Sequence, residues 1–191
     1  NPWQFSLTPG LTALVIEIPL LQLPFSAIWW LGFIAGSLLL IVVLLAEYIV
    51  VDPNDTRQPV AAAVLTAVSF ALFLVLTTAL RFGGMRLFLL LPTLGAAVFL
   101  VSLRIMRLRQ PDHWSILEAG VVSLVTLQIA AALHYSPLSP VAFGLALLGP
   151  AYMLTDFFAA IAKGEPARKA LAEPLVILVI VWGTALAVGR S

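Results

Sequence analysis

Asp156 is the residue with the strongest claim to chemistry, because it is a carboxylate inside an otherwise apolar stretch. It lies more than one helical turn before Lys163, and Pro150 precedes it by about two turns. A proline inside a helix frees a backbone carbonyl and bends the helix. A carboxylate beside such a bend is typical of a proton or cation site in a transporter. The alternative is a structural ion pair near the membrane surface with an arginine such as Arg104.

The other acidic residues near the ends of apolar stretches have simpler interpretations. Ser115 and Glu118 match a capping box, in which the serine caps the helix and the glutamate reaches back. Glu173 precedes a proline in the expected first turn of the last apolar stretch, where the helix dipole favours an anion. Glu47 lies at the end of the first stretch and is interpreted as an interfacial residue.

The two histidines offer little for cofactor binding. His113 lies in a polar loop, and His134 ends an apolar stretch about 19 residues beyond Ser115. A histidine can be an axial ligand to haem or bacteriochlorophyll. The separation from Ser115 is roughly 29 Å along a helix, so such a pigment on His134 would lie at the rim of the bilayer. No His, Asp and Glu set has metal-ligand spacing. We therefore expect no cofactor, no metal and no catalytic residue.

A basic cluster follows the third apolar stretch, at Arg104, Arg107 and Arg109. Positions 104 and 107 share one face of a helix. Anionic lipid headgroups are the simplest partner for such a cluster. Simple anchoring at the cytoplasmic surface is the alternative explanation.

The composition places the chain in lipid. Of 191 residues, 62% are apolar and 10% are charged, which is too little charge to cover a soluble domain. The chain has no cysteine, which excludes disulfides and thiolate chemistry. A net charge of +1 gives no reason to expect nucleic acid as a partner.

The apolar stretches predict an all-α, polytopic membrane helix bundle. A bilayer core of roughly 30 Å needs about 20 apolar residues per helix. Residues 1–26 contain prolines and a central Glu17, and the apolar run there is too short to span. We predict an interfacial or re-entrant segment there, with docking to a partner protein as the alternative. Residues 27–191 form the transmembrane domain, with about six spans predicted at 27–50, 60–81, 86–104, 115–135, 140–162 and 170–189.

The basic residues of the short loops predict the orientation. Seven lysines and arginines fall on one side of the six spans and three on the other, which makes the first side cytoplasmic. An even number of spans then leaves both termini outside the cytoplasm. The seven are Arg57, Arg104, Arg107, Arg109, Lys163, Arg168 and Lys169, and the three are Arg81, Arg86 and Arg190.

Two pairs of small residues predict close helix packing. Gly32 and Gly36 are four residues apart in the first span, and Gly183 and Ala187 are four apart in the last. Such pairs let another helix approach closely. The approaching helix belongs either to the same bundle or to another subunit, and the sequence leaves both open.

A short motif carries a family resemblance. From the second span onward the chain resembles a family of uncharacterised bacterial multi-span membrane proteins, most clearly at 132–140 (Ala-Leu-His-Tyr-Ser-Pro-Leu-Ser-Pro) and at the Asp52-Pro53 turn. In these relatives an asparagine commonly stands where His134 stands here. The resemblance implies a bacterial cytoplasmic membrane and brings no catalytic residues. It also favours an energy-converting complex, because the family is associated with bacteria that include phototrophs.

Two functions fit these features of the sequence better than a third, an intramembrane enzyme, for which Asp156, Glu118 and His134 would have to lie at one depth. The first is a non-catalytic accessory or structural subunit of a larger membrane complex, respiratory or photosynthetic, whose partners are membrane lipids and other membrane subunits. The second is a small proton- or cation-coupled transporter centred on Asp156. The absence of an internal repeat weighs against the second, because transporters are usually built on repeats.

Overall fold

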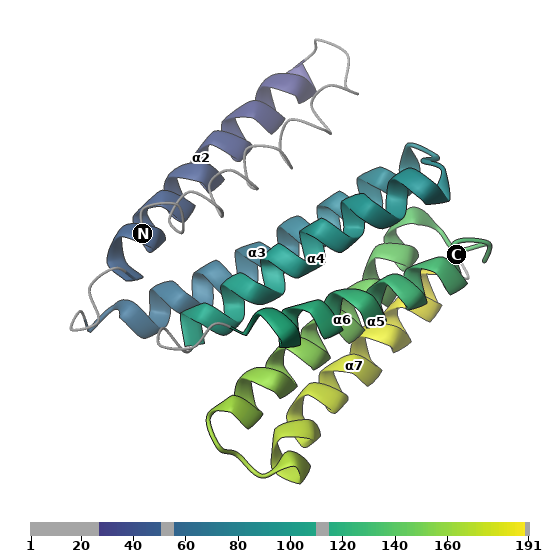
Figure 1. The fold of residues 1–191 in the computed structure, drawn as a ribbon. Coiled ribbons are helices and arrows are strands. Elements are labelled where there is room, and N and C mark those ends of the chain that lie inside the picture. Colours follow the sequence, from purple (N-terminus) through teal and green to yellow (C-terminus); the bar gives the residue numbers. More distant parts are fainter. Residues whose placement is uncertain (1–26, 51–55, 110–114, 190–191) are drawn as a thin grey trace. The chain divides into compact units, whose positions relative to one another are not determined.

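The computed structural model describes residues 27–50, 56–109 and 115–189, and in these ranges every regular element is an α-helix. The predicted segment 1–26, the Asp52-Pro53 turn and His113 lie outside the described residues. The helices are α2 (Ala27–Val50), α3 (Gln58–Phe82), α4 (Leu87–Arg109), α5 (Ile116–Leu133), α6 (Pro140–Ala162) and α7 (Ala167–Gly189) (Figure 1).

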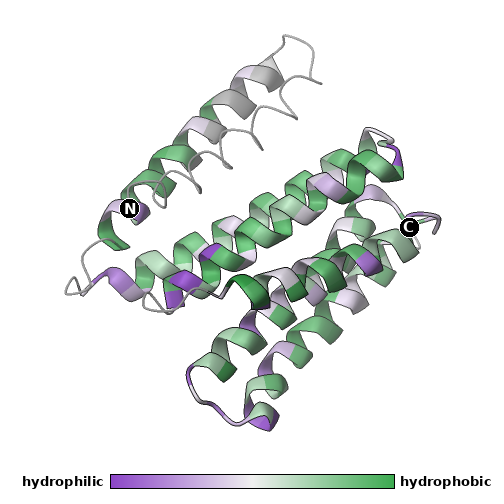
Figure 2. Cartoon of the chain, viewed as in Figure 1, coloured by the Kyte–Doolittle hydropathy of each residue, from purple (hydrophilic) through white to green (hydrophobic). Residues whose placement is uncertain are grey.

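Five of these helices, α3 to α7, are long and apolar enough to cross a membrane. Figure 2 shows their bodies mostly in hydrophobic colours, with hydrophilic colours gathered near several of their ends. The prediction of an all-α multi-span membrane protein is therefore confirmed. In α2 the described stretch Leu40–Val50 is apolar but shorter than a span. The sixth span stays a prediction.

Turn chemistry sets the helix ends, and the predicted loops between α3 and α4, between α5 and α6 and between α6 and α7 fall where the structure has them. Gly84 and Gly164 follow α3 and α6 with positive φ angles of 61° and 83°, a region in which a side chain is strained. Ser139 caps α6 by accepting a hydrogen bond from the Ala142 amide. Two boundaries differ from the prediction by three residues or more. α4 continues to Arg109 rather than 104, and α7 begins at 167 rather than 170.

The chain divides into two compact units, residues 1–72 and 73–191, with the boundary inside α3. In the first unit, hydroxyls on α3 bond to their own helix: Thr66 donates to the Ala62 carbonyl at 2.8 Å and Ser69 to that of Leu65 at 2.7 Å. Each hydroxyl is thus hydrogen-bonded within its own helix, so placing it in lipid costs little free energy. Hydroxyls in this part of α3 are therefore compatible with a transmembrane helix.

In the second unit, α6 packs closely against α7 and α4 against α5, while α5 and α4 also contact α6. Figure 1 shows α6 and α7 running side by side. Most of the largest fully buried side chains of this unit are apolar, and they form its packed interior. They include Phe73, Leu90, Leu94, Val98, Ile105, Val122, Phe143 and Leu147.

The proline in α6 is compensated by α7. Pro150 has no amide hydrogen, so the Ala146 carbonyl one turn earlier loses its helical donor. The indole Nε1 of Trp182 donates to that carbonyl at 3.1 Å. Gly149 makes room for the ring, because a Cβ there would lie 2.9 Å from Leu178 Cδ1 and 3.2 Å from Trp182 Cδ1. The carbonyl that the proline frees thus holds α6 and α7 together.

Replacing Trp182 with phenylalanine is expected to lower the free energy of unfolding by about 1 kcal/mol, because the buried Ala146 carbonyl then has no donor. Unfolding in mixed detergent micelles, followed by circular dichroism, measures the change. Pro150→Ala supplies the control, since the new amide hydrogen can bond to Ala146. In the Pro150→Ala background, Trp182→Phe should lower the free energy of unfolding by clearly less. Equal losses in both backgrounds would contradict the assigned hydrogen bond between Trp182 and the Ala146 carbonyl.

Candidate functional site

A polar cavity of the second unit lies where α4 ends, α6 ends and α7 begins. It has a volume of about 220 Å³ and is lined mainly by polar atoms. We call it the polar pocket. The residues around it are Arg109, Tyr152, Asp156, Ala160, Lys163, Glu165, Lys169, Ala170, Glu173 and Pro174.

Asp156 forms an ion pair with Arg109 in this pocket. The partner is therefore not Arg104, the example that the sequence suggested, because α4 continues for another five residues and carries Arg109 to the pocket. The side chains are 15% and 29% exposed, so both charges are largely withdrawn from solvent. Asp156 lies six residues, or roughly 9 Å, before the end of α6, which is a depth an arginine from the helix end can reach. The geometry matches the structural alternative for Asp156 and leaves its role as an ion or proton site untested.

A buried hydroxyl pair fixes α4 against α6 next to this ion pair. Ser102 Oγ and Thr155 Oγ1 are 3.0 Å apart, and Thr155 donates to the Ala151 carbonyl at 2.7 Å. Ser102 therefore donates to Thr155. Ser102 and Arg109 are seven residues apart and share one face of α4, so both connect this face to α6.

Four further charged residues surround the polar pocket: Lys163, Glu165, Lys169 and Glu173. All four are exposed and, within the described part of the chain, form no ion pair. The prediction for Glu173 is wrong. Because α7 begins at residue 167, Glu173 lies almost two turns inside the helix, where the dipole has little effect, and it lines the pocket instead.

At the opposite end of the second unit, Arg81 joins the end of α3 to the α5–α6 turn. Its guanidinium donates to the carbonyls of His134 at 2.8 Å and Ser136 at 3.0 Å, and lies 5.1 Å from the Phe143 ring centre. His134 is the C-cap of α5, and its ring packs edge-on against Tyr135. Its Nδ1 is buried and has no hydrogen-bond partner in the described residues. Arg81 therefore binds the backbone of His134, and the ring of His134 contributes a packing contact with Tyr135.

The predicted capping box at the start of α5 is wrong. Ser115 makes no side-chain cap hydrogen bond, because its φ of −88° and ψ of 54° depart from the extended conformation that a capping serine adopts. Glu118 remains in the first turn, where the helix dipole favours an acid. Glu47, interpreted as an interfacial residue, is buried near the end of α2.

The three arginines of the basic cluster are not equivalent. Arg109 pairs with Asp156. Arg104 and Arg107 are half-buried, and each already takes part in an interaction within the protein. Lipid binding by the cluster remains a prediction. All three arginines already interact within the protein, so less of their positive charge is available to lipid headgroups.

The two predicted packing pairs have different outcomes. The surroundings of Gly32 and Gly36 on α2 lie outside the described residues. Gly183 has no atom within 4 Å of a Cβ placed on it, and Ala187 is exposed. This pair is therefore not used inside the second unit.

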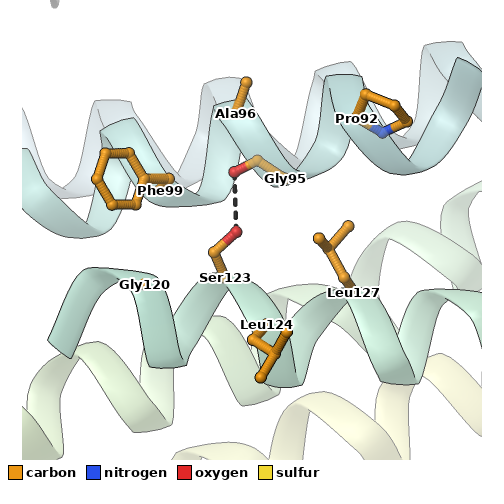
Figure 3. A pocket seen from close by; sticks show the side chains of 8 residues that line it. All are labelled: Pro92, Gly95, Ala96, Phe99, Gly120, Ser123, Leu124 and Leu127. Atoms are coloured by element: carbon orange, nitrogen blue, oxygen red, sulfur yellow. Dashed lines mark hydrogen bonds between the residues drawn. The ribbon is translucent and has the colours of Figure 1, made fainter. Parts of the chain in front are cut away.

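A second cavity, of about 420 Å³, is an open and mainly apolar groove between α4 and α5. Figure 3 shows Ser123 bonded across it to the Gly95 carbonyl, at 2.9 Å. A Cβ on Gly95 would lie 2.9 Å from Leu127 Cδ1, so the glycine permits this close approach. The groove contributes to packing and has no charged side chain.

The polar pocket is lined by charged side chains of both signs but offers no set of metal ligands in the described residues. Among the described residues, no three His, Asp or Glu side chains lie close enough to hold a metal ion. Sequence reasoning identified Asp156 and Arg109 but missed the contributions of Tyr152 and the two lysines. The spacing of Tyr152 and Asp156, four apart on one helix face, was a signal for the first.

Comparison with known proteins identifies one family for this chain. No curated protein and no solved structure matches the chain. One family, described as a protein of unknown function (DUF5656), matches residues 1–188. That family covers nearly the whole chain and carries no assigned activity, as the resemblance in the sequence predicted. The chain belongs to the DUF5656 family of proteins of unknown function.

Proposed function

We propose that this protein is a non-catalytic accessory subunit of a larger membrane complex, and that α7 is the helix that contacts the partner. One observation carries the proposal. Only Ala170, Pro174 and Ala185 are buried on α7, although it is 23 residues long and apolar enough to span a membrane.

The open face of α7 has the form of a helix-docking surface. Val176, Ile180, Gly183 and Ala187 are spaced at three and four residues, so they line one face of the helix. All four are exposed. A small-residue pair within an apolar stripe allows two membrane helices to approach closely. We call these four residues the α7 face.

The polar groups of the second unit support a structural role. The Ser102–Thr155 pair and the Trp182–Ala146 bond join neighbouring helices, and the Asp156 carboxylate is paired with Arg109. In lipid, such bonds mainly satisfy groups that water would otherwise satisfy. Each therefore has a structural explanation that requires no reaction.

We also propose that the membrane is the bacterial cytoplasmic membrane, with both termini outside the cytoplasm. The support is the excess of lysine and arginine on one side of the helices. Arg109, from the larger group of basic residues, contacts Asp156 near the end of α6. Arg81, from the smaller group, contacts the α5–α6 turn at the start of α6. Members of the two groups therefore lie at opposite ends of α6, as the proposed orientation requires.

Gly183→Leu is expected to release the partner without unfolding the protein, because the new side chain enters open space. The measurement is native mass after gentle detergent extraction, combined with unfolding of the purified variant. The chain has no cysteine, so a single Ala187→Cys carrying a photo-crosslinker reports the contact without background. The crosslink should disappear when Gly183→Leu is added.

Leu117→Cys is the matched control, since Leu117 on α5 is also exposed, to 83%, and can carry the same crosslinker. It should give no protein crosslink. A monomeric mass for the extracted protein, or crosslinks from both positions alike, would contradict the proposal. A crosslink only to a second copy of this chain would replace it with a homo-oligomer.

A proton- or cation-coupled carrier is the second candidate, and one observation favours it. Asp156 lines a polar pocket that opens near the end of two transmembrane helices. The ion pair with Arg109 weighs against it, because a carboxylate that already holds a guanidinium is not free to bind a transported cation.

A further inference from the structure

We propose that the polar pocket binds the headgroup of an amine-bearing phospholipid, which is a phosphate ester with a primary ammonium group. The site is formed by this chain alone, from the ends of α6 and α7 and the last residue of α4. It involves neither the α7 face nor a protein partner, so it is independent of the accessory role.

The pocket offers positive charge for a phosphate. Lys163 is the C-cap of α6, and Lys169 lies in the first turn of α7, on the two sides of the connecting loop. Both are exposed and have no ion pair in the described residues. The first turn of α7 contains no acid, so no side chain of that turn opposes the positive end of the helix dipole. Two ammonium groups at one cavity are suited to a phosphate oxyanion.

The pocket also offers negative charge for an amine. Asp156 is occupied by Arg109, so Glu165 and Glu173 are the carboxylates that remain. Their number equals that of the two lysines. A purely anionic ligand would leave both glutamates beside like charge, whereas a zwitterion satisfies lysines and glutamates together. A primary ammonium can also donate hydrogen bonds to a carboxylate.

The surroundings of the pocket favour a lipid over a soluble phosphate ester. Ile161, Leu171 and Leu175 are exposed, and each is adjacent in sequence to a residue that lines the pocket. They belong to two helices that are long and apolar enough to span a membrane. Acyl chains can therefore cover these side chains while the headgroup lies in the pocket.

Native mass spectrometry of the purified full chain tests the proposal with phosphatidylethanolamine, phosphatidylcholine and phosphatidylglycerol of identical acyl chains. Phosphatidylethanolamine should be retained about tenfold better than either of the others, since only it supplies both a phosphate and a hydrogen-bonding ammonium. Lys163→Gln with Lys169→Gln should lower its retention about tenfold. Glu173→Gln should remove the preference over phosphatidylcholine.

Arg168→Gln is the matched control, because Arg168 is an exposed cation of the same turn but does not line the pocket. It should leave retention unchanged, and an equal loss would show unspecific charge attraction and overturn the site. Equal retention of the three lipids, or a preference for phosphatidylglycerol, would overturn the zwitterion assignment. Displacement of the lipid by an equal concentration of soluble phosphoethanolamine would overturn the lipid assignment in favour of a free phosphate ester.

Discussion

Replacing Gly144 with alanine is expected to lower the free energy of unfolding by about 1–3 kcal/mol, the range for adding a methyl group to a closely packed interior. A Cβ at this position on α6 would lie 2.8 Å from Thr78 Oγ1, 2.9 Å from Thr77 Oγ1 and 3.0 Å from Leu74 Cδ1. Thr77 cannot move aside easily. Its hydroxyl bonds to the Phe73 and Leu74 carbonyls at 3.0 and 2.9 Å, and its branched side chain is stiff.

Gly120→Ala on α5 is the control for this prediction. No atom lies within 4 Å of a Cβ at Gly120, so alanine there meets open space. It should stabilise the protein by about 0.5–1 kcal/mol, because alanine forms helix better than glycine. Unfolding in mixed detergent micelles gives both values. Effects of the same sign at the two glycines would contradict the close contact between α3 and α6.

Breaking the Asp156–Arg109 ion pair is expected to have a comparable effect. Asp156→Asn and Arg109→Gln should each lower the free energy of unfolding by about 1–3 kcal/mol, less than a fully buried pair because both side chains retain some exposure. Each single variant leaves one charge without its partner in a largely covered position. The double variant should therefore lower the free energy of unfolding by less than the sum of the two single losses.

Lys163→Gln is the control for the ion pair, since Lys163 borders the same pocket but is exposed and should change stability by no more than about 0.5 kcal/mol. Additive losses in the double variant would contradict a direct interaction. The same variants also separate the two proposed functions. Asp156→Asn that keeps full stability yet abolishes proton-coupled uptake in proteoliposomes would favour the carrier.

The helices were largely predictable from sequence because the bilayer imposes one requirement on every span. A run of about 20 apolar residues must be helical, and proline and glycine mark where it ends. This places α6 at 140–162 in both the prediction and the structure. The ends of α4 and α7 were harder, because Arg107, Arg109 and Arg168 are polar yet continue a helix beyond the apolar core. Charged side chains at a membrane surface do not stop a helix.

The candidate site was only half predictable. The sequence identified Asp156 because an acid in an apolar span costs free energy unless something compensates for it. It did not identify Arg109 as the partner, because three arginines occupy neighbouring turns and only the rotation of α4 against α6 selects one. The same limit applies to Glu173, whose position in the pocket depends on where α7 starts.

The sequence by itself determined the solvent, the fold class and the family, because hydropathy and turn residues act locally along the chain. Only the tertiary structure decided which small residues meet a neighbour. Gly144 and Gly149 lie against other helices, whereas Gly183 faces open space, although all three are glycines within apolar spans. The structure also showed that the carbonyl freed by Pro150 is satisfied by Trp182, 36 residues away in sequence. The physical reason is that helix propensity and burial depend on local composition, while pairing depends on the rotation and depth of one helix against another, which no local pattern encodes.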